Sequence, residues 1–196
     1  MVTVSETDEI YERYLRKAIA EVNALWSELQ AAGGPNAIPV VGTGHPLANV
    51  FLLKFRPLPA EIQEGVAFYG RAGEAIIKAL RRLHVDPLEV YGTNCLKFGT
   101  EDVEQARGWL TRELHIVQPK LVVAMGPEAL AFLNALEFPL ARPVGDAAGE
   151  LQHFTPTTEA LVVPDIDASL DEQPAKTAFW NAFKQLGPWW AELPPY

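Results

Sequence analysis

Short, fully apolar runs alternate with longer amphipathic stretches along most of this chain. Residues 121–125 are apolar at every position and end at Gly126 and Pro127, and residues 161–163 form a second such run. Continuous apolar runs of this length are typical of strands that are buried on both faces of a parallel sheet. Their alternation with helices predicts an α/β fold, a three-layer α/β/α sandwich with a short, mainly parallel central sheet.

The periodicity of the apolar residues places the individual elements. Helices are expected at residues 5–32, 71–84, 101–117 and 174–186, with another beginning at Pro127. Strands are expected at residues 38–41, 89–98, 121–125 and 161–163, with a loop and a small hairpin between 137 and 158. Residues 50–53 are either a strand or a buried loop, and Pro57 and Pro59 predict that regular structure stops there. The helix pattern also assigns Ile77 and Val103 to faces that point into the core.

The carboxyl ends of parallel strands meet at one edge of a sheet, and ligands of such sheets bind beyond that edge. Four tracts are therefore expected to converge there: residues 42–48, 93–98, 126–128 and 164–170. The length of 196 residues predicts one domain over 1–196, with a long helix in residues 1–37 packed on it.

The formal net charge of −9 counts against a general nucleic-acid binder, because phosphates attract basic proteins. Basic residues are nevertheless concentrated between residues 54 and 97. Arg71, Lys78 and Arg82 share an outer helix face in this stretch. They form either a local basic surface or solvated helix charges without a specific role, and both interpretations stay open.

Cys95 is the only cysteine, which excludes an intrachain disulfide and a four-cysteine metal or iron–sulfur site. It lies in a strand-like run, and we expect it to be an inert core residue. No residue spacing indicates a metal, and we expect no cofactor. No apolar run is long enough to span a membrane, and the acidic start of the chain shows no secretory signal. We therefore expect a cytoplasmic protein, and a monomer.

A glycine-framed aromatic residue and a strand that ends on asparagine give the clearest indication of function. Phe68 lies in the tract Gly-Val-Ala-Phe-Tyr-Gly-Arg-Ala-Gly at 65–73, and Asn94 ends Tyr-Gly-Thr-Asn at 91–94. A flat ring at the start of a helix can stack on a flat ligand, and an amide offers one donor edge and one acceptor edge. Together the tracts predict a pocket for a planar heterocycle such as a nucleobase. Taken singly, Phe68 is also explained as a core aromatic under a loop, and Asn94 as a turn cap.

The order of these tracts resembles the uracil-DNA glycosylase superfamily, and within it the thermophile-type family 4. The family's glycine-framed tract corresponds to residues 65–73, its Thr-Asn strand to 91–97, and its Pro-Lys-x-Val strand with the following helix to 118–130. The resemblance covers residues 38–187. It implies the fold described above, a base flipped out of DNA as the ligand, and single- or double-stranded DNA as the partner.

The resemblance also implies roles for individual residues. Phe68 would stack on the flipped base, and Asn94 would read the polar edge of that base. The first loop of the family would contribute base-binding positions, and the strand ends would contribute DNA contacts. The residues at these further positions are Gly42 and Gly44 for the base, and Arg71, Lys97 and Ser169 for DNA.

Departures from the family pattern concern catalysis. Thr43 stands where the family has an acidic residue that positions water, Asp167 stands where it has a histidine, and the four cluster cysteines are absent. That histidine would stabilise the negative charge on the departing base, and loss of such a group costs about 10²–10³ in rate. Asp167 would replace it as a proton donor if burial, or a proton shared with Asp165, kept it neutral. His45, one loop away, is a second candidate donor, and a structural loop hydrogen bond is its alternative role.

Three functions therefore stay open. The first is a divergent glycosylase that hydrolyses the N-glycosidic bond of a deaminated or damaged base in DNA. The second is a catalytically degraded member of the family that binds a nucleobase or nucleic acid without cleavage. The third is an N-glycosidic hydrolase of a small nucleoside-like substrate, which the net charge of −9 favours.

Overall fold

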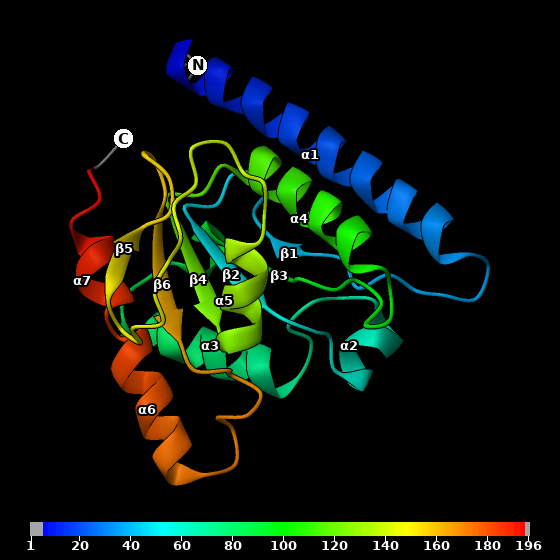
Figure 1. Ribbon diagram of the computed structural model, residues 1–196. Helices are drawn as coiled ribbons and strands as arrows, with labels where there is room; N and C mark the ends of the chain where they lie inside the picture. Colours follow the sequence, from blue (N-terminus) through cyan, green and yellow to red (C-terminus); the bar gives the residue numbers. More distant parts are fainter. Residues whose placement is uncertain (1–5, 195–196) are drawn as a thin grey trace.

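A six-stranded sheet lies at the centre of the computed structural model, which describes residues 6–194 (Figure 1). From one edge to the other, the strands are β1 (Thr43–Gly44), β3 (Val90–Asn94), β2 (Val50–Lys54), β4 (Leu121–Met125), β6 (Glu159–Val163) and β5 (Leu151–His153). The four central strands run parallel, and the two edge strands are antiparallel to their neighbours. The predicted α/β class with a mainly parallel sheet is confirmed.

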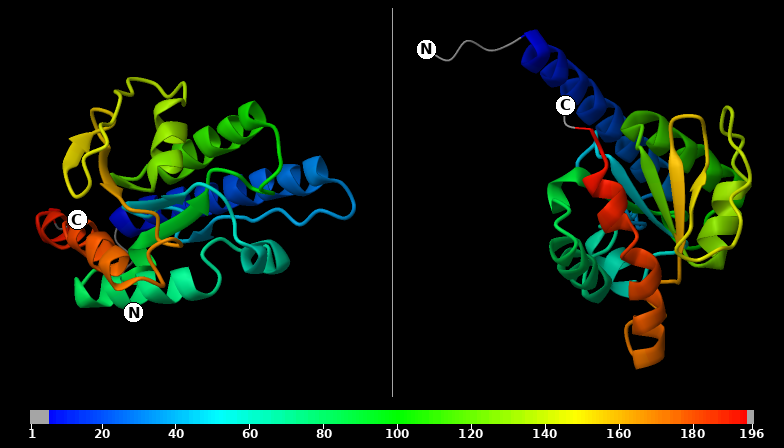
Figure 2. Two further views of the ribbon diagram at one scale, coloured as in Figure 1. Left: turned by 60° about the horizontal axis from the view of Figure 1, so that its bottom comes forward. Right: turned by 90° about the vertical axis from the view of Figure 1, so that its left-hand side faces the viewer.

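Helices cover both faces of this sheet and complete three layers (Figure 2). On one face lie α3 (Arg71–Arg82), α6 (Gln173–Phe183) and α7 (Leu186–Ala191), and on the other lie α4 (Val103–Val117) and α5 (Pro127–Asn134). In the chain, α2 (Pro59–Glu64) precedes α3, and the 3-10 turn η1 (Pro87–Glu89) follows it. The predicted three-layer sandwich is confirmed.

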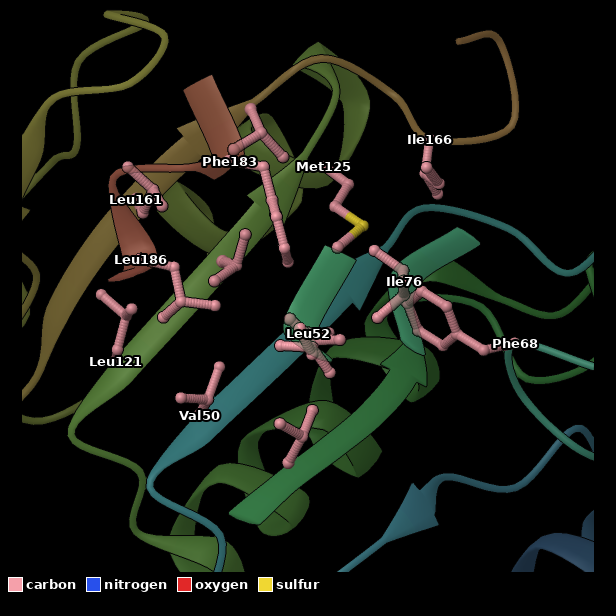
Figure 3. Close-up of a cluster of buried hydrophobic side chains, with 14 of the residues drawn as sticks. Val50, Leu52, Phe68, Ile76, Leu121, Met125, Leu161, Ile166, Phe183 and Leu186 are labelled. Atoms are coloured by element: carbon pink, nitrogen blue, oxygen red, sulfur yellow. The ribbon is translucent and has the colours of Figure 1, made fainter. Parts of the chain in front are cut away.

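Alternate residues of each strand contribute to two separate cores, because neighbouring side chains of a strand point to opposite faces. Val50 and Leu52 of β2 belong to the core beneath α3 and α6, together with Phe68 (Figure 3). Phe51 and Leu53 pack beneath α4 and α5 on the opposite face. This burial on both faces explains why the strand sequences are continuously apolar rather than alternating.

The long helix α1 (Glu6–Gly33) lies outside the sandwich and packs along α4. Leu25 and Leu29 form a small core with Trp109 of α4, and the carboxylate of Glu28 pairs with the guanidinium of Arg112. The part of the predicted N-terminal segment that the structure describes therefore packs on the rest of the chain, and residues 1–5 lie outside the described range. No helix within residues 6–194 is long and apolar enough to cross a bilayer.

Residues 38–41 do not form the predicted strand. Pro39 has no N–H group to donate to a strand ladder, and Val41 forms only an isolated bridge, with Val66. The chain then enters β1, which runs antiparallel to β3. The first parallel strand of the sheet is therefore β2, which settles the open interpretation of residues 50–53 in favour of a strand.

Three further predictions about local structure were wrong. Pro59 does not stop regular structure but begins α2, because the missing N–H of proline is not needed in the first turn of a helix. Ile77 and Val103 are exposed rather than buried. Ile77 is rotated by about 100° around the axis of α3 from the buried Ile76, so it lies at the edge of the buried face. Val103 is the first residue of α4. Of the small hairpin expected between residues 137 and 158, only β5 lies in that range; it pairs with β6, which contains the strand expected at residues 161–163.

Candidate functional site

Two polar residues end the neighbouring strands β2 and β3. Lys54 is the last residue of β2, Asn94 is the last residue of β3, and the two are paired in the sheet register. Lys54 follows Leu52 by two positions, so its side chain points to the same face as Leu52, toward α3. The side chains of Lys54 and Asn94 are 3% and 0% exposed. A lysine and an amide are therefore held side by side at the carboxyl edge of the sheet.

The carboxylate of Glu61, from α2, joins this pair. Its Oε2 accepts hydrogen bonds from Lys54 Nζ at 2.7 Å and from the backbone N–H of Leu58 at 2.8 Å. Its Oε1 accepts from the backbone N–H of Phe68 at 2.5 Å and from Asn94 Nδ2 at 3.3 Å. Four donors match the acceptor capacity of an ionised carboxylate. Glu61 thus ties the ends of β2 and β3 to the loops on either side of α2.

Asp167 reaches the same lysine from the loop that follows β6. Its Oδ2 lies 2.8 Å from Lys54 Nζ. The loop is held by Asp165, whose Oδ1 accepts from the backbone N–H groups of Asp167 and Ala168 at 2.7 and 3.1 Å. The predicted sharing of a proton between Asp165 and Asp167 does not match these contacts, because the two carboxylates have separate partners. We call Lys54, Glu61, Asn94 and Asp167 the strand-end cluster.

The strand-end cluster retains acceptor atoms for a ligand. Burial raises the pKa of Asp167; the hydrogen bond and charge of Lys54 oppose this shift, and the charges of Glu61 and Asp165 add to it. Within residues 6–194, the buried atoms Asn94 Oδ1 and Asp167 Oδ1 have no hydrogen-bond partner. A buried acceptor without a donor is unfavourable by about 1–3 kcal/mol. Asn94 Oδ1 is therefore suited to accept a hydrogen bond from a bound donor group, and Asp167 Oδ1 can accept one when the carboxyl group is ionised or donate one when it is protonated.

Phe68 lies beside this cluster in an unusual backbone conformation. Its φ of 60° is uncommon for a residue other than glycine, and such strain clusters at ligand sites. The ring packs on Gly92, where an added Cβ would stand 2.8 Å from it, and near Ile76 (Figure 3). Lys54 Nζ lies over the ring, 5.2 Å from its centroid. Phe68 is therefore a core aromatic that also faces the strand-end cluster, so the two interpretations of this residue are compatible.

A cleft of about 530 Å³ adjoins the ring of Phe68 between α3 and the β1 edge of the sheet. Thr43 and Gly44 line one side of the cleft, and Tyr69 and Ile77 line the other. Phe68, Thr43 and Gly44 thus share a cleft, as predicted. The amide of Asn94 instead points to Glu61, so the predicted single cleft between Phe68 and Asn94 is not formed.

The structure does not bring His45 to this edge of the sheet. Its backbone N–H donates to the carbonyl of Val90, at the start of β3. Its Nδ1 accepts from the backbone N–H of Leu47 at 3.1 Å, and its Nε2 lies 3.3 Å from the hydroxyl of Tyr11 in α1. The alternative role of a loop hydrogen bond matches these contacts. The predicted convergence of residues 42–48 is wrong here, because β1 carries the chain away from the carboxyl edge.

Two other predicted residues have structural roles in the described chain. Gly42 is buried against Tyr91, whose hydroxyl would stand 2.1 Å from an added Cβ. Lys97 is 0% exposed. Its Nζ donates to Thr93 Oγ1 at 2.6 Å, to the carbonyl of Asn94 at 2.7 Å and to the carboxylate of Glu113. These contacts use all three donors of the ammonium group, so the predicted DNA contact of Lys97 is not supported.

Ser169 and Arg71 differ from each other in exposure. Ser169 is buried, and its hydroxyl donates to the carbonyl of Asp165 at 2.6 Å. Arg71 is exposed at the start of α3 and pairs with the carboxylate of Asp171 at 2.6 Å. Arg71 remains available to solvent near the loop that carries Asp167, whereas Ser169 stabilises that loop.

Sequence reasoning missed the importance of Lys54 and Glu61. Lys54 directly follows a buried apolar run, and a polar residue at the end of a parallel strand faces the ligand edge of the sheet. Glu61 follows Pro59 by two positions, and a proline with a nearby glutamate is typical of a helix start. These signals identify a strand end and a helix start, but they do not predict that the two meet.

A metal centre has no support in the described chain. Within residues 6–194, no group of three His, Cys, Asp or Glu side chains is arranged to hold a metal ion. Cys95 is buried, and that burial raises the pKa of its thiol, which agrees with an inert core residue.

Comparison with known proteins identifies the family. A sequence model of the uracil DNA glycosylase superfamily matches residues 41–185. The chain belongs to the uracil-DNA glycosylase superfamily. It is similar to the type-4 uracil-DNA glycosylase of Pyrobaculum aerophilum, with 29% identity over 59% of this chain and 62% of that protein. It is also similar to the type-4 uracil-DNA glycosylase of Archaeoglobus fulgidus, with 25% identity over 76% of this chain and 80% of that protein.

These matches confirm the predicted membership, and the identities agree with a divergent relative of type 4. The match spans about three fifths of the Pyrobaculum protein. With a single cysteine, the chain has no set of four cluster cysteines. The chain therefore has the fold of the superfamily, and the strand-end cluster lies at the carboxyl edge of its sheet.

Proposed function

We propose that this protein hydrolyses the N-glycosidic bond of a deaminated or damaged base flipped out of DNA. The observation that carries the proposal is the position of Asp167. Its half-buried carboxyl group, with a raised pKa, is held by Lys54 in one polar cluster with Asn94. A glycosylase needs a group that supplies a proton or positive charge to the departing base, and this cluster offers both.

The chemistry follows from these groups. As the bond between C1′ and the base nitrogen breaks, its electron pair moves onto the base. Protonated Asp167 donates its proton to the base, water adds to C1′, and the proton released by that water restores the acid. The Lys54 ammonium, paired with Glu61 at 2.7 Å, offsets the negative charge that develops. A positioned general acid contributes about 10²–10⁴ in rate.

A second function, base binding without cleavage, is favoured by one further observation. Stacked aromatic rings have centroids about 4.5–7 Å apart, and the Lys54 ammonium lies 5.2 Å from the Phe68 centroid. The ammonium therefore lies where a base would stack on that face of Phe68. A base that stacks there must displace Lys54. Because Lys54 also holds Asp167, such binding would disturb the group on which cleavage depends.

A glycosylase assay separates these functions. Single- and double-stranded oligonucleotides, each with one uracil, hypoxanthine or xanthine, are incubated with the protein and tested for released base and abasic sites. Excision of any of these bases supports the proposal. Tight binding of a deaminated base without excision supports the second function. Cleavage of free nucleosides alone would assign the site to a small substrate. A protein that shows no binding and no cleavage would contradict both functions.

A further inference from the structure

A groove between α3 and α6 begins at the loop that carries Asp167. It has a volume of about 450 Å³, and the loop residues Ile166, Ser169 and Leu170 line one end of it. The two helices lie on the same face of the sheet (Figure 2). The groove is distinct from the cleft beside Phe68, which lies on the opposite side of α3 toward β1. A strand that leaves the site past Ser169 would enter this groove.

The charged residues that line the groove are all basic. They are Lys78 and Arg82 from α3 and Lys176 from α6. All three are exposed, on a chain whose net charge is −9. Lys78 and Arg82 are four residues apart and so share one face of α3. Positive charge is thus concentrated where phosphates of a bound strand would pass.

An aromatic platform accompanies these charges. The guanidinium of Arg82 lies over the ring of Trp180, 4.2 Å from its centroid. Unpaired bases bind proteins by stacking on aromatic rings and on guanidinium planes. The half-buried Trp180 therefore offers a stacking surface that Arg82 covers and extends.

An acidic neighbour does not cancel the basic surface. Asp171 lies near the loop end of the groove, and its pKa is lowered first by the hydrogen bond of Arg71 and also by the charge of Lys176. Arg71 pairs with this carboxylate at 2.6 Å. The positive charges of Lys78 and Arg82 are therefore not neutralised by Asp171.

We infer that the α3–α6 groove binds single-stranded DNA that flanks the base-excision site. Lys78, Arg82 and Lys176 bind its phosphates, and Trp180 stacks on one of its bases. The inference rests on the proposed function only in taking DNA as the partner. It extends the predicted basic surface of Arg71, Lys78 and Arg82 to α6, whose Lys176 and Trp180 complete it.

Fluorescence anisotropy with an undamaged oligothymidine of twelve nucleotides tests this inference, because such a strand needs no excision. Replacing Lys78, Arg82 and Lys176 together by Gln should flatten the dependence of log K on log salt by about 2, since each phosphate contact in a single strand contributes about 0.7. Trp180→Leu keeps an apolar side chain without stacking and should weaken binding on the order of tenfold. The matched control replaces the exposed Arg13, Arg16 and Lys17 of α1 by Gln, which removes the same charge elsewhere.

The outcomes separate this inference from the proposed function. Weaker binding in both groove variants, with the α1 control near wild type, supports the groove even if the protein excises no base. Equal losses in the groove and control variants would show a general charge effect and overturn the inference. Wild-type protein that does not bind the strand at low salt, or that prefers a blunt duplex, would also overturn it.

Discussion

The ammonium of Lys54 lies 2.8 Å from the carboxylate of Asp167, although 113 positions separate the two residues in the chain. This contact joins the carboxyl end of β2 to the loop after β6. It forms only because both strands are parallel and end at the same edge of the sheet. Glu61 takes a second hydrogen bond from the same ammonium, so one buried cation contacts two carboxyl groups.

The first prediction concerns the coupling of this pair. Lys54→Met leaves the buried carboxylate of Glu61 and the half-buried carboxyl group of Asp167 without their cation, and it should lower the free energy of unfolding by about 3–5 kcal/mol. Adding Asp167→Asn removes one of these charges, so the double variant should be more stable than the sum of the single effects, with a coupling of about 0.5–3 kcal/mol. Urea unfolding of the wild type, the two single variants Lys54→Met and Asp167→Asn, and the double variant gives this coupling free energy. Additive effects would show that Lys54 and Asp167 do not interact in solution.

The second prediction concerns the pH dependence of stability. Because burial raises the pKa of Asp167 above 3.8, the folded protein binds this proton more tightly than the unfolded chain. Ionisation of Asp167 therefore lowers stability as pH rises through the folded pKa. Asp167→Asn lacks this loss, so its Tm relative to wild type should increase as pH rises from 4 toward neutral, which thermal unfolding by circular dichroism measures.

Asp171→Asn is the matched control for this series. The hydrogen bond of Arg71 lowers the pKa of Asp171, so its pH effect should have the opposite sign. It should also be small, because Asp171 is exposed to solvent. A difference between Asp167→Asn and wild type that does not change with pH would contradict the raised pKa.

The third prediction concerns the contact between Phe68 and Gly92. A Cβ at position 92 would stand 2.8 Å from the Phe68 ring, so Gly92→Ala should displace the ring at a cost of about 1–3 kcal/mol in stability. Gly108→Ala is the control: no atom lies within 4 Å of its Cβ position in α4, and it should stabilise the helix by about 0.5–1 kcal/mol. Chemical denaturation measures both, and equal effects would exclude a specific contact at Gly92.

The fourth prediction concerns the buried ion pair of Lys97 and Glu113. Glu113→Gln removes the counter-ion of a fully buried ammonium and should destabilise the protein by about 3–5 kcal/mol. The hydroxyl of Tyr91 and the ammonium of Lys97 donate to different oxygens of Glu113, and a glutamine keeps only one acceptor oxygen for the two of them. Lys97→Met should likewise lower stability, while the salt dependence of DNA binding stays that of the wild type. A reduced salt dependence in Lys97→Met would restore Lys97 as a DNA contact.

The sheet was predictable from the sequence, whereas much of the site was not. Residues 121–125 read as a buried strand because burial on both faces requires apolar side chains at every position. The segment 38–41 has a similar apolar composition, but Pro39 cannot donate to a ladder. That misassignment placed Thr43 and His45 at the carboxyl edge of the sheet, where the antiparallel β1 does not bring His45.

Residue type was also an incomplete guide to the role of the basic residues. Lys54, Lys97 and Arg82 fall in one basic stretch of the sequence, yet Lys54 and Lys97 are buried and Arg82 is exposed. What separates them is the position of a carboxylate. Glu113 lies on α4, which packs on the face of the sheet opposite α3. Glu61 lies on α2, which was not predicted because Pro57 and Pro59 indicated an end of regular structure. Long-range pairing of this kind leaves no local pattern in a single sequence.

The rate of base excision as a function of pH tests the central claim most directly. Single-turnover rates are measured from pH 5 to 9 for wild type, Asp167→Asn and the exposed control Asp171→Asn, on the deaminated base that wild type excises best. Since protonated Asp167 is the active form, the wild-type rate should fall as pH rises. Asp167→Asn should be slower by about 10²-fold or more at low pH and lose this dependence, while Asp171→Asn follows wild type. An Asp167→Asn protein with the wild-type rate, or a wild-type rate that increases with pH, would contradict the account.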